Sequence, residues 1–246
     1  MAIDIDIKSV FYGRREILRN ISFALTSPSL TAVIGRNGSG KSTLISAISG
    51  LARYEGRVIV EGDEVSSTDR KTLATRISLV PQELRRPHIT VAELVSYGRR
   101  PYLKLGEGLR DIDREIIAKA TSDADLYDIG DKHLDTISGG ELRRAYFGMM
   151  LAQDTSVVLL DEATAFMDAD FERRFIEMQR ELAMSKTVIT VMHNLSLALS
   201  NSDNILLLDN GEQIFFGSPE ELLSTDLVEK TFSVKRYSSD GKIFFA

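Results

Sequence analysis

The sequence predicts an α/β protein with a parallel sheet of the nucleotide-binding type and a helical block inserted in its middle. The apolar runs Val157–Leu160 and Thr187–Val191 are continuous rather than alternating, which suits strands buried on both faces of a parallel sheet. A helical pattern over Phe171–Met184 lies between them, as a βαβ unit requires. From about Glu83 to Ala152, apolar residues recur with helical spacing instead, so we expect a helical insert over residues 83–152.

The other elements follow from similar patterns. Ile3, Ile5 and Ile7 share one face of an alternating segment, which predicts a first strand, and the run Ile21–Leu25 predicts a second. Further strands are expected at Leu30–Ile34, Val58–Val60, Ile77–Val80 and Ile205–Leu208. Further helices are expected at Ser42–Leu51, Val91–Tyr97, Asp113–Asp123 and Leu142–Ala152.

Composition excludes several classes of function. The 246 residues include 30 Lys and Arg against 36 Asp and Glu, and this net charge of −6 argues against a protein that coats nucleic acid. No apolar run approaches the ~18 residues that cross a bilayer, so we expect no direct membrane insertion. The absence of cysteine excludes disulfides, cysteine-held iron–sulfur clusters and thiol catalysis, and fits a cytosolic protein. The chain is expected to form one domain over residues 1–246.

A phosphate-binding loop follows the strand Leu30–Ile34. The residues that match G-x-x-x-x-G-K-[ST] are Gly35, Arg36, Asn37, Gly38, Ser39, Gly40, Lys41 and Ser42. Glycines let backbone N–H groups wrap a phosphate chain, Lys41 adds charge at the β- and γ-phosphates, and Ser42 offers a hydroxyl to Mg²⁺. A chance glycine-rich turn is the alternative, but a predicted strand and helix flank the loop. Since no Asn-Lys-x-Asp motif occurs, a GTPase is not expected.

Two adjacent carboxylates end the strand Val157–Leu160. Asp161 is suited to hold Mg²⁺, directly or through water, and Glu162 to orient and deprotonate an attacking water. A strand capped by solvated acids is the commoner explanation of such a pair, but the phosphate-binding loop favours the catalytic interpretation.

A second glycine-rich loop precedes the predicted helix at Leu142. Its residues are Ser138, Gly139, Gly140 and Glu141. A serine hydroxyl, glycine N–H groups and a helix N-terminus can together bind an anion. Taken alone, the loop is better explained as an N-capped helix after a flexible turn.

The ordered motifs resemble those of the ABC ATPase family over nearly the whole chain. The phosphate-binding loop is followed by Gln82 after a strand, by Ile137–Glu141 as the signature loop, by Asp161 and Glu162, and by His193 after an apolar strand. The resemblance implies a P-loop ABC ATPase with a RecA-like core, an N-terminal antiparallel β subdomain and an inserted helical subdomain.

The resemblance also implies roles for individual residues. Gln82 would sense Mg²⁺ and the transport partner, His193 would contact the γ-phosphate, and Thr43 would join Ser42 in binding ATP. Tyr12 matches the aromatic residue that stacks on adenine, although as a bare observation it is equally consistent with a core aromatic. His88 and His133 lie in loop-like stretches, and we expect both to be ordinary surface or packing residues.

Some positions depart from the commonest family pattern without removing a phosphate, Mg²⁺ or water contact. These are Ile137 and Glu141 in place of Leu and Gln, Ala163 in place of Pro, Ala165–Asp168 in place of a Ser-Ala-Leu-Asp-like loop, and Asn194 in place of Asp. The altered loop at Ala165–Asp168 puts communication between two sites in doubt, rather than activity itself.

The family pattern implies a homodimer and a membrane partner. In the resembled family a site is completed when two chains meet head to tail, so that Lys41 of one chain and Ser138 of the other share one ATP. We expect such a pair to drive transmembrane permease subunits at the cytoplasmic face of the membrane, with a solute-binding protein acting indirectly. The basic residues between Glu83 and Arg110 are either a docking surface for that partner or a solvated face.

The segment Arg86–Tyr102 resembles the ferric-siderophore, haem and vitamin B12 importer branch, within which iron–siderophore uptake is favoured. A non-transport ABC ATPase that serves iron–sulfur cluster assembly is the alternative. A translation or DNA-repair ABC protein would show tandem ATPase units or long coiled coils, which the sequence lacks.

Overall fold

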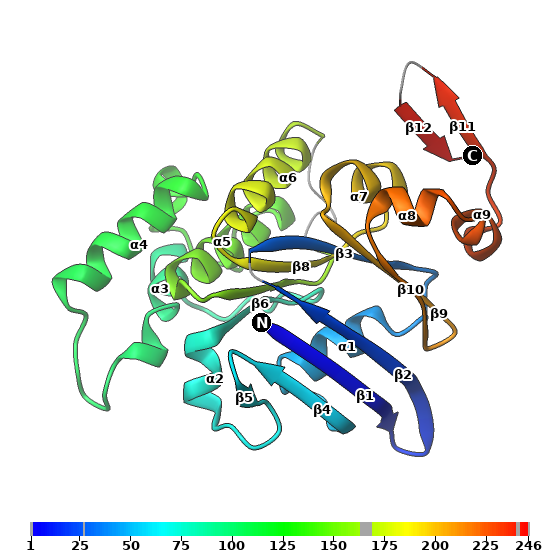
Figure 1. Ribbon diagram of the computed structural model, residues 1–246. Helices are drawn as coiled ribbons and strands as arrows, with labels where there is room; N and C mark the ends of the chain where they lie inside the picture. Colours follow the sequence, from blue (N-terminus) through cyan, green and yellow to red (C-terminus); the bar gives the residue numbers. More distant parts are fainter. Residues whose placement is uncertain (1, 27, 163–168, 240–241, 246) are drawn as a thin grey trace.

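A mixed sheet covered by helices organises the chain in the computed structural model, which describes residues 2–26, 28–162, 169–239 and 242–245 (Figure 1). Its ten described strands, from one edge to the other, are β5 (Asp63–Glu64), β4 (Tyr54–Val60), β1 (Ile3–Tyr12), β2 (Arg15–Leu25), β10 (Glu212–Gly217), β9 (Asn204–Asp209), β3 (Ser29–Gly35), β8 (Thr187–Val191), β7 (Val157–Leu160) and β6 (Ile77–Val80). A separate hairpin pairs β11 (Arg236–Ser239) with β12 (Lys242–Phe245).

The described helices are α1 (Lys41–Ile48), α2 (Arg70–Arg76), α3 (Val91–Tyr97), α4 (Asp111–Asp123), α5 (Gly139–Gln153), α6 (Ala169–Ala183), α7 (Leu195–Asn201), α8 (Pro219–Leu223) and α9 (Leu227–Phe232). Short 3₁₀ turns cover Arg100–Tyr102 and Tyr127–Ile129. Of the helices that the structure describes, none is long and apolar enough to span a membrane.

The sheet has a parallel half and an antiparallel half. Strands β9, β3, β8, β7 and β6 run parallel, and β2, β1 and β4 pair antiparallel, with Ile3 opposite both Leu25 and Val60. The two halves meet where β10 and β2 form a single parallel pair, Glu212 with Arg19. The predicted α/β class is therefore confirmed.

Period-two alternation in the parallel strands explains their continuous apolar sequences. In β7, Val157 and Leu159 face a core shared with α1, while Val158 and Leu160 face a second core built by α3, α4, α5 and α6. The same alternation in β9 places Leu206 in the first core and Leu207 in a third core under α7 and α8. Both faces are covered, so the strands are mainly apolar, and their buried polar residues are small, among them Thr31, Ser78, Thr187 and Thr190.

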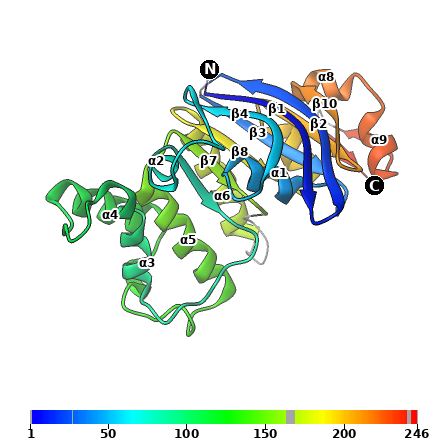
Figure 2. The same ribbon diagram turned by 90° about the horizontal axis from the view of Figure 1, so that it is seen from below.

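Helices α3, α4 and α5 pack together beside the parallel edge of the sheet (Figure 2). The buried carboxylate of Asp113 joins them: its oxygens accept bonds from Arg99 Nε at 3.0 Å and from Arg110 Nε at 2.7 Å. Arg99 also donates to the carbonyl of Ala152, at the end of α5. These contacts fix the start of α4 against the end of α5.

The basic residues between Glu83 and Arg110 therefore divide into two groups. Arg86, Arg99 and Arg110 make internal bonds, Arg86 to the carbonyls of Leu134 and Ile137. Of these three, only Arg99 is buried, and Arg86 and Arg110 keep exposed surface beside their internal bonds. Arg85, Arg100 and Lys104 are exposed as well, so Arg99 is the one basic residue of the segment that burial removes from a docking surface.

Most predicted elements are confirmed, and the differences lie at their ends: β2 begins at Arg15 rather than Ile21, and β4 at Tyr54 rather than Val58. Helix α1 ends at Ile48 rather than Leu51, because Gly50 takes a left-handed φ of +70° and closes the helix with bonds from Gly50 to Ala47 and from Leu51 to Ser46. Helix α5 begins at Gly139 rather than Leu142, because Ser138 caps it. Elements absent from the prediction are short: α2, α7, α8, α9, β5, β10, β11 and β12.

Candidate active site

The parallel strands carry the predicted catalytic residues to one edge of the sheet. The phosphate-binding loop follows β3, Gln82 comes just after β6, Asp161 and Glu162 follow β7, and His193 follows β8. Parallel neighbours end on the same side, so the loops after them converge, which is where open α/β sheets place their ligand sites. A cavity of about 510 Å³ opens there, lined by Arg15, Ile17, Asn37, Gly38, Gly40, Lys41, Ser42, Thr43, Gln82, Glu162 and His193.

The phosphate-binding loop depends on two glycines. A Cβ atom at Gly35 would collide with the carbonyl oxygen of Leu208, and one at Gly40 would collide with the side chain of Leu18. Gly40 is also the N-cap of α1 with a left-handed φ of +98°, and no side chain caps the N–H groups of the first turn. Those N–H groups and the positive end of the helix therefore remain available to an anion at the cavity.

Lys41 is held at the centre of the loop. Its Nζ donates to the carbonyls of Gly35 at 2.8 Å and Arg36 at 3.0 Å, and the residue is only 5% exposed. Burial lowers the pKa of Lys41, while the charges of Glu162 and Asp161 oppose the shift. Among the described residues, the direct hydrogen-bond partners of Lys41 are thus backbone carbonyls, and a phosphate oxygen is a stronger acceptor than either carbonyl.

Ser42 and Asp161 form the second part of the site. Ser42 Oγ donates to Asp161 Oδ1 at 3.1 Å, across the gap between α1 and the end of β7. Burial raises the pKa of Asp161 because it disfavours the charged form, and a nearby cation would stabilise that charge. A hydroxyl and a carboxylate are oxygen ligands of the kind that Mg²⁺ prefers, and the pair fits that ion.

Glu162 joins the other two predicted catalytic side chains. Gln82 Nε2 donates to Glu162 Oε2 at 2.6 Å, and His193 Nε2 lies 2.7 Å from Glu162 Oε1. The backbone of Glu162 has a left-handed φ of +50°, which is strained for a residue other than glycine. The structure thus brings Gln82, Glu162 and His193 together, each from the end of a different strand.

Arg143 is a site residue that the sequence reasoning missed. It lies buried in the first turns of α5 and donates to the carbonyls of Glu162 at 2.7 Å and Gln82 at 3.4 Å. Helical spacing offered a signal, because Arg143 shares the buried face of α5 with Phe147 and Met150. A buried arginine needs acceptors, and these acceptors belong to two catalytic segments.

The signature loop lies away from this cavity. Ser138 Oγ accepts the N–H of Glu141 at 3.2 Å, and Glu141 Oε2 accepts the N–H of Ser138 at 2.8 Å. The capped-helix interpretation of the loop is therefore correct for the single chain. Ser138 and Gly139 are exposed, and Gly140 and Glu141 are half-buried.

Tyr12 also stays outside the cavity lining. It ends β1, is 55% exposed and pairs with Arg15, which does line the cavity. The alternative of a core aromatic is thereby excluded. The departures at Ala163 and Ala165–Asp168 lie outside the described residues.

The fold and the site define a P-loop nucleotide-binding protein: the loop around Lys41, the Ser42–Asp161 pair and Glu162 stand at the end of a parallel sheet. The family model described as "ABC transporter" matches residues 18–165, and the chain belongs to that family. Its membership makes it an ATP-binding domain whose ATPase activity is coupled to transport.

Relatives span most of the chain. It is 35% identical to the petrobactin import ATP-binding protein YclP of Bacillus subtilis, over 91% of this chain and 89% of the relative. It is 33% identical to the ferric enterobactin transport ATP-binding protein FepC of Escherichia coli, over 91% of this chain and 84% of the relative.

A solved bacterial ABC exporter with ATP bound superposes with a TM-score of 0.82 at 27% identity, over 94% of this chain and 41% of that one. A solved transporter described as being of metal-chelate type superposes with a TM-score of 0.82 at 20% identity, over 99% of this chain and 95% of that one, which bears on the fold alone.

Proposed function

We propose that this chain is the ATP-hydrolysing subunit of a membrane importer for iron–siderophore complexes. The observation that carries the hydrolytic part is the meeting of Glu162 with Gln82 and His193 beside the Lys41 loop. The siderophore class rests on the relatives, whose names specify petrobactin and ferric enterobactin. The relatives give no support to the alternative of iron–sulfur cluster assembly.

The cavity residues divide the work of phosphoryl transfer. The loop from Gly35 to Thr43 wraps the phosphates with N–H groups, and Lys41 exchanges its two carbonyl partners for β- and γ-phosphate oxygens. Bound at Ser42 and Asp161, Mg²⁺ would neutralise charge that builds up on the phosphates. Phosphoryl transfer needs mainly position and charge, and this loop supplies both.

Glu162 activates the attacking water. Its two oxygens accept from Gln82 and contact His193, so the carboxylate is held in one orientation at the cavity wall. When a water molecule takes the place of one of these partners, the Glu162 carboxylate accepts a proton from that water. His193 then contacts the γ-phosphate, and Gln82 reports occupancy toward the helical segment that begins beyond it.

A second copy of the chain completes the site. Ser138 is exposed at a helix N-terminus and does not line its own chain's cavity, which suits contact with nucleotide held by a partner. Its hydroxyl accepts from Glu141, so its proton remains available for a phosphate oxygen. Tyr12, exposed beside Arg15, is in a position to stack on the base. The functional unit is thus a head-to-tail homodimer of the single ATPase domain 1–246.

Permease subunits dock on the helical subdomain, residues 83–152. A groove of about 680 Å³ lies there, and its lining includes Tyr97, Arg100, Lys104 and Leu105. Leu105 is fully exposed and Tyr97 is 40% exposed, beside two cationic side chains. Apolar side chains beside Arg100 and Lys104, with Glu107 also in the lining, suit a short helix or loop of a membrane protein. We expect this chain to lie peripherally at the cytoplasmic face of the membrane. A solute-binding protein acts on the permease without contact to this chain.

Glu162→Gln tests the hydrolytic proposal. The amide keeps the size of the side chain but cannot accept a proton, so turnover should fall by roughly 10²-fold or more with little change in ATP affinity. Steady-state phosphate release and equilibrium ATP binding measure the two effects, and size exclusion should reveal an ATP-bound dimer. Turnover equal to that of the unmodified chain would contradict the assignment.

Co-purification tests the transport proposal separately. The epitope-tagged chain, extracted in mild detergent, should bring down a polytopic membrane protein, and Leu105→Asp should release that partner while ATP binding stays intact. Recovery of soluble scaffold proteins in its place would favour the assembly-factor alternative.

A further inference from the structure

Two loops of the helical region lie side by side. The first, residues 85–91, runs on from Gln82, and the second, residues 130–137, runs into Ser138. Backbone bonds of 3.0 Å join Leu134 N to the carbonyl of Ile89 and Val91 N to the carbonyl of Lys132. Arg86 adds two bonds from the first loop to carbonyls of the second. The paired loops therefore have a fixed relative position.

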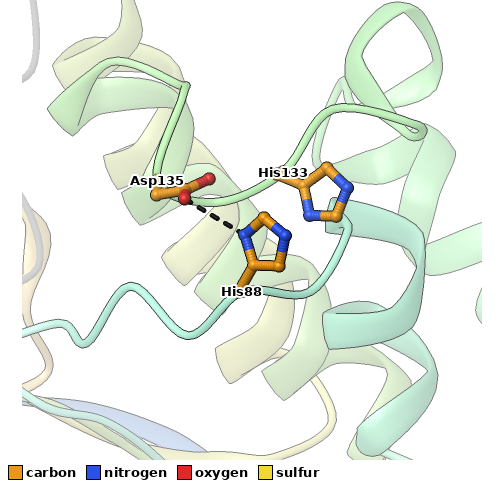
Figure 3. Close-up of side chains that lie close together, drawn as sticks. All are labelled: His88, His133 and Asp135. Atoms are coloured by element: carbon orange, nitrogen blue, oxygen red, sulfur yellow. Dashed lines mark hydrogen bonds and ion pairs between the residues drawn. The ribbon is translucent and has the colours of Figure 1, made fainter.

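His88 on the first loop points toward His133 and Asp135 on the second, and the three side chains lie close together (Figure 3). One donor atom from each lies within 4.8 Å of the others, and His88 Nδ1 lies 3.2 Å from Asp135 Oδ2. The imidazole rings stack with centroids 4.3 Å apart and planes 14° from parallel. Within the described part of the chain, no other group of three or more His, Asp or Glu side chains meets in this way.

Packing alone does not account for the cluster. The Nδ1 atom of His133 is buried and has no hydrogen-bond partner, although native structures pair almost all buried polar atoms. That atom belongs to the ring that faces His88 in Figure 3. The expectation of ordinary surface or packing histidines therefore leaves one nitrogen unexplained.

We propose that His88, His133 and Asp135 bind a divalent transition-metal cation of the Zn²⁺ class. Two imidazole nitrogens and one carboxylate oxygen form a three-residue donor set, with water in the remaining position. Mg²⁺ and Ca²⁺ prefer oxygen ligands and are disfavoured here.

The geometry is within reach of such an ion. Ligand distances of about 2.0–2.2 Å require donor atoms roughly 3.3 Å apart, a spacing that His88 and Asp135 already have. The side chains of His88 and Asp135 are 78% and 46% exposed, so His88 has room to rotate out of the ring stack and direct a nitrogen to a centre shared with His133 and Asp135.

The ion joins the segment after Gln82 to the segment before Ser138. It cross-links the paired loops beside their backbone bonds and stabilises the stretch that connects a catalytic glutamine with the signature loop. This role goes beyond the proposed transport function and does not rest on it.

Calorimetric titration of the full-length, nucleotide-free chain with ZnCl₂ in excess Mg²⁺ tests the proposal. We expect one equivalent of Zn²⁺ to bind, and His88→Ala and Asp135→Asn each to weaken binding at least tenfold. His193→Ala removes the third histidine of the chain, and Asp131→Asn removes an exposed acid of the same loop. Both control variants should still bind one equivalent of Zn²⁺.

Two further outcomes decide the matter. Zn²⁺ should slow hydrogen exchange of the Leu134 amide in the unmodified chain and leave it unchanged in His88→Ala, whose far-ultraviolet circular dichroism reports whether it is folded. Absence of stoichiometric binding, or binding that survives His88→Ala and Asp135→Asn but is lost in His193→Ala, would overturn the proposal.

Discussion

Helices α1 and α5 both begin beside glycines and a serine, yet they use their N-termini differently. At α1 the cap is Gly40, which has no side chain, and no acidic residue stands in the first turn. At α5 the cap is Ser138, and Glu141 completes a reciprocal capping box. The first helix leaves its N–H groups open to the cavity, whereas the second satisfies two of its own.

The contrast shows which helix N-terminus can bind an anion within a single chain. A helix N-terminus attracts phosphate when its N–H groups lack an internal acceptor. Helix α5 supplies its own carboxylate, and hydrogen bonds from Ser138 lower the pKa of Glu141. The signature loop therefore holds a folded, exposed N-terminus that binds a phosphate less readily than α1 does.

Of the substitutions considered, Lys41→Ala should have the largest effect, because it acts on anion binding at α1. It removes the charge that the loop carbonyls hold in place, and ATP affinity should fall about 100-fold or more. Equilibrium binding of a fluorescent ATP analogue measures the loss. Lys8→Ala, at an exposed position of β1, is the control and should keep the original affinity.

Asp113→Ala should destabilise the packing of α3, α4 and α5 and leave the phosphate-binding loop at α1 intact. It strands the buried Arg99, and the free energy of unfolding should fall by about 3 kcal/mol in urea titrations. Asp111→Ala, at an exposed acid of the same helix, should change it by less than about 0.5 kcal/mol. ATP affinity should be unaffected by either.

The same substitution has a defined pH dependence. The bonds from Arg110, followed by those from Arg99, hold the pKa of Asp113 well below 3.8, the value taken for the unfolded chain. Its contribution to stability is therefore present above about pH 4 and is lost as the pH falls further. The difference in unfolding free energy between the unmodified chain and Asp113→Ala should persist from pH 8 to 5 and shrink below 4.

Arg143→Ala should weaken the contact between α5 and the catalytic segments at Gln82 and Glu162. Without its bonds to the carbonyls of Glu162 and Gln82, the catalytic carboxylate loses a fixed position, and kcat should fall about tenfold at unchanged ATP affinity. Arg143→Lys should recover part of the rate. An equal loss of rate in Arg114→Ala, at an exposed arginine, would show that the effect is not specific to this contact.

Ser138→Ala should have the smallest effect on stability, and it separates the capping role of Ser138 from a role in the shared site. Loss of the cap costs about 1 kcal/mol, and Ser218→Ala, which removes the serine of the same capping box at α8, should cost a similar amount. Only Ser138→Ala should also lower ATPase turnover and ATP-dependent pairing in sedimentation. Equal turnover in both variants would argue against a role for Ser138 in a shared site.

Much of the site could be predicted from the sequence because its parts are local. The glycine spacing of the phosphate-binding loop and the acids after an apolar strand each lie within a few residues. Parallel strands then bring Gln82, Glu162 and His193 to one edge without further information. Helix α1 ends early at the left-handed cap of Gly50, which apolar periodicity alone does not specify.

Long-range contacts could not be predicted in this way. Arg143 finds its acceptors in two segments that precede and follow it by 61 and 19 residues, and only packing of α5 against the sheet brings them together. Likewise, the basic residues between Glu83 and Arg110 looked uniform until Arg99 was found buried against Asp113.

The amino-acid order by itself determined the α/β class, the phosphate-binding loop and the strand ends that carry the carboxylates, since these follow from short-range periodicity and spacing. Tertiary structure alone decided that Glu162 takes a strained backbone held by Arg143, and that His88 and His133 stack beside Asp135. The physical reason is that burial and side-chain contacts between distant segments exist only after the sheet and helices have packed.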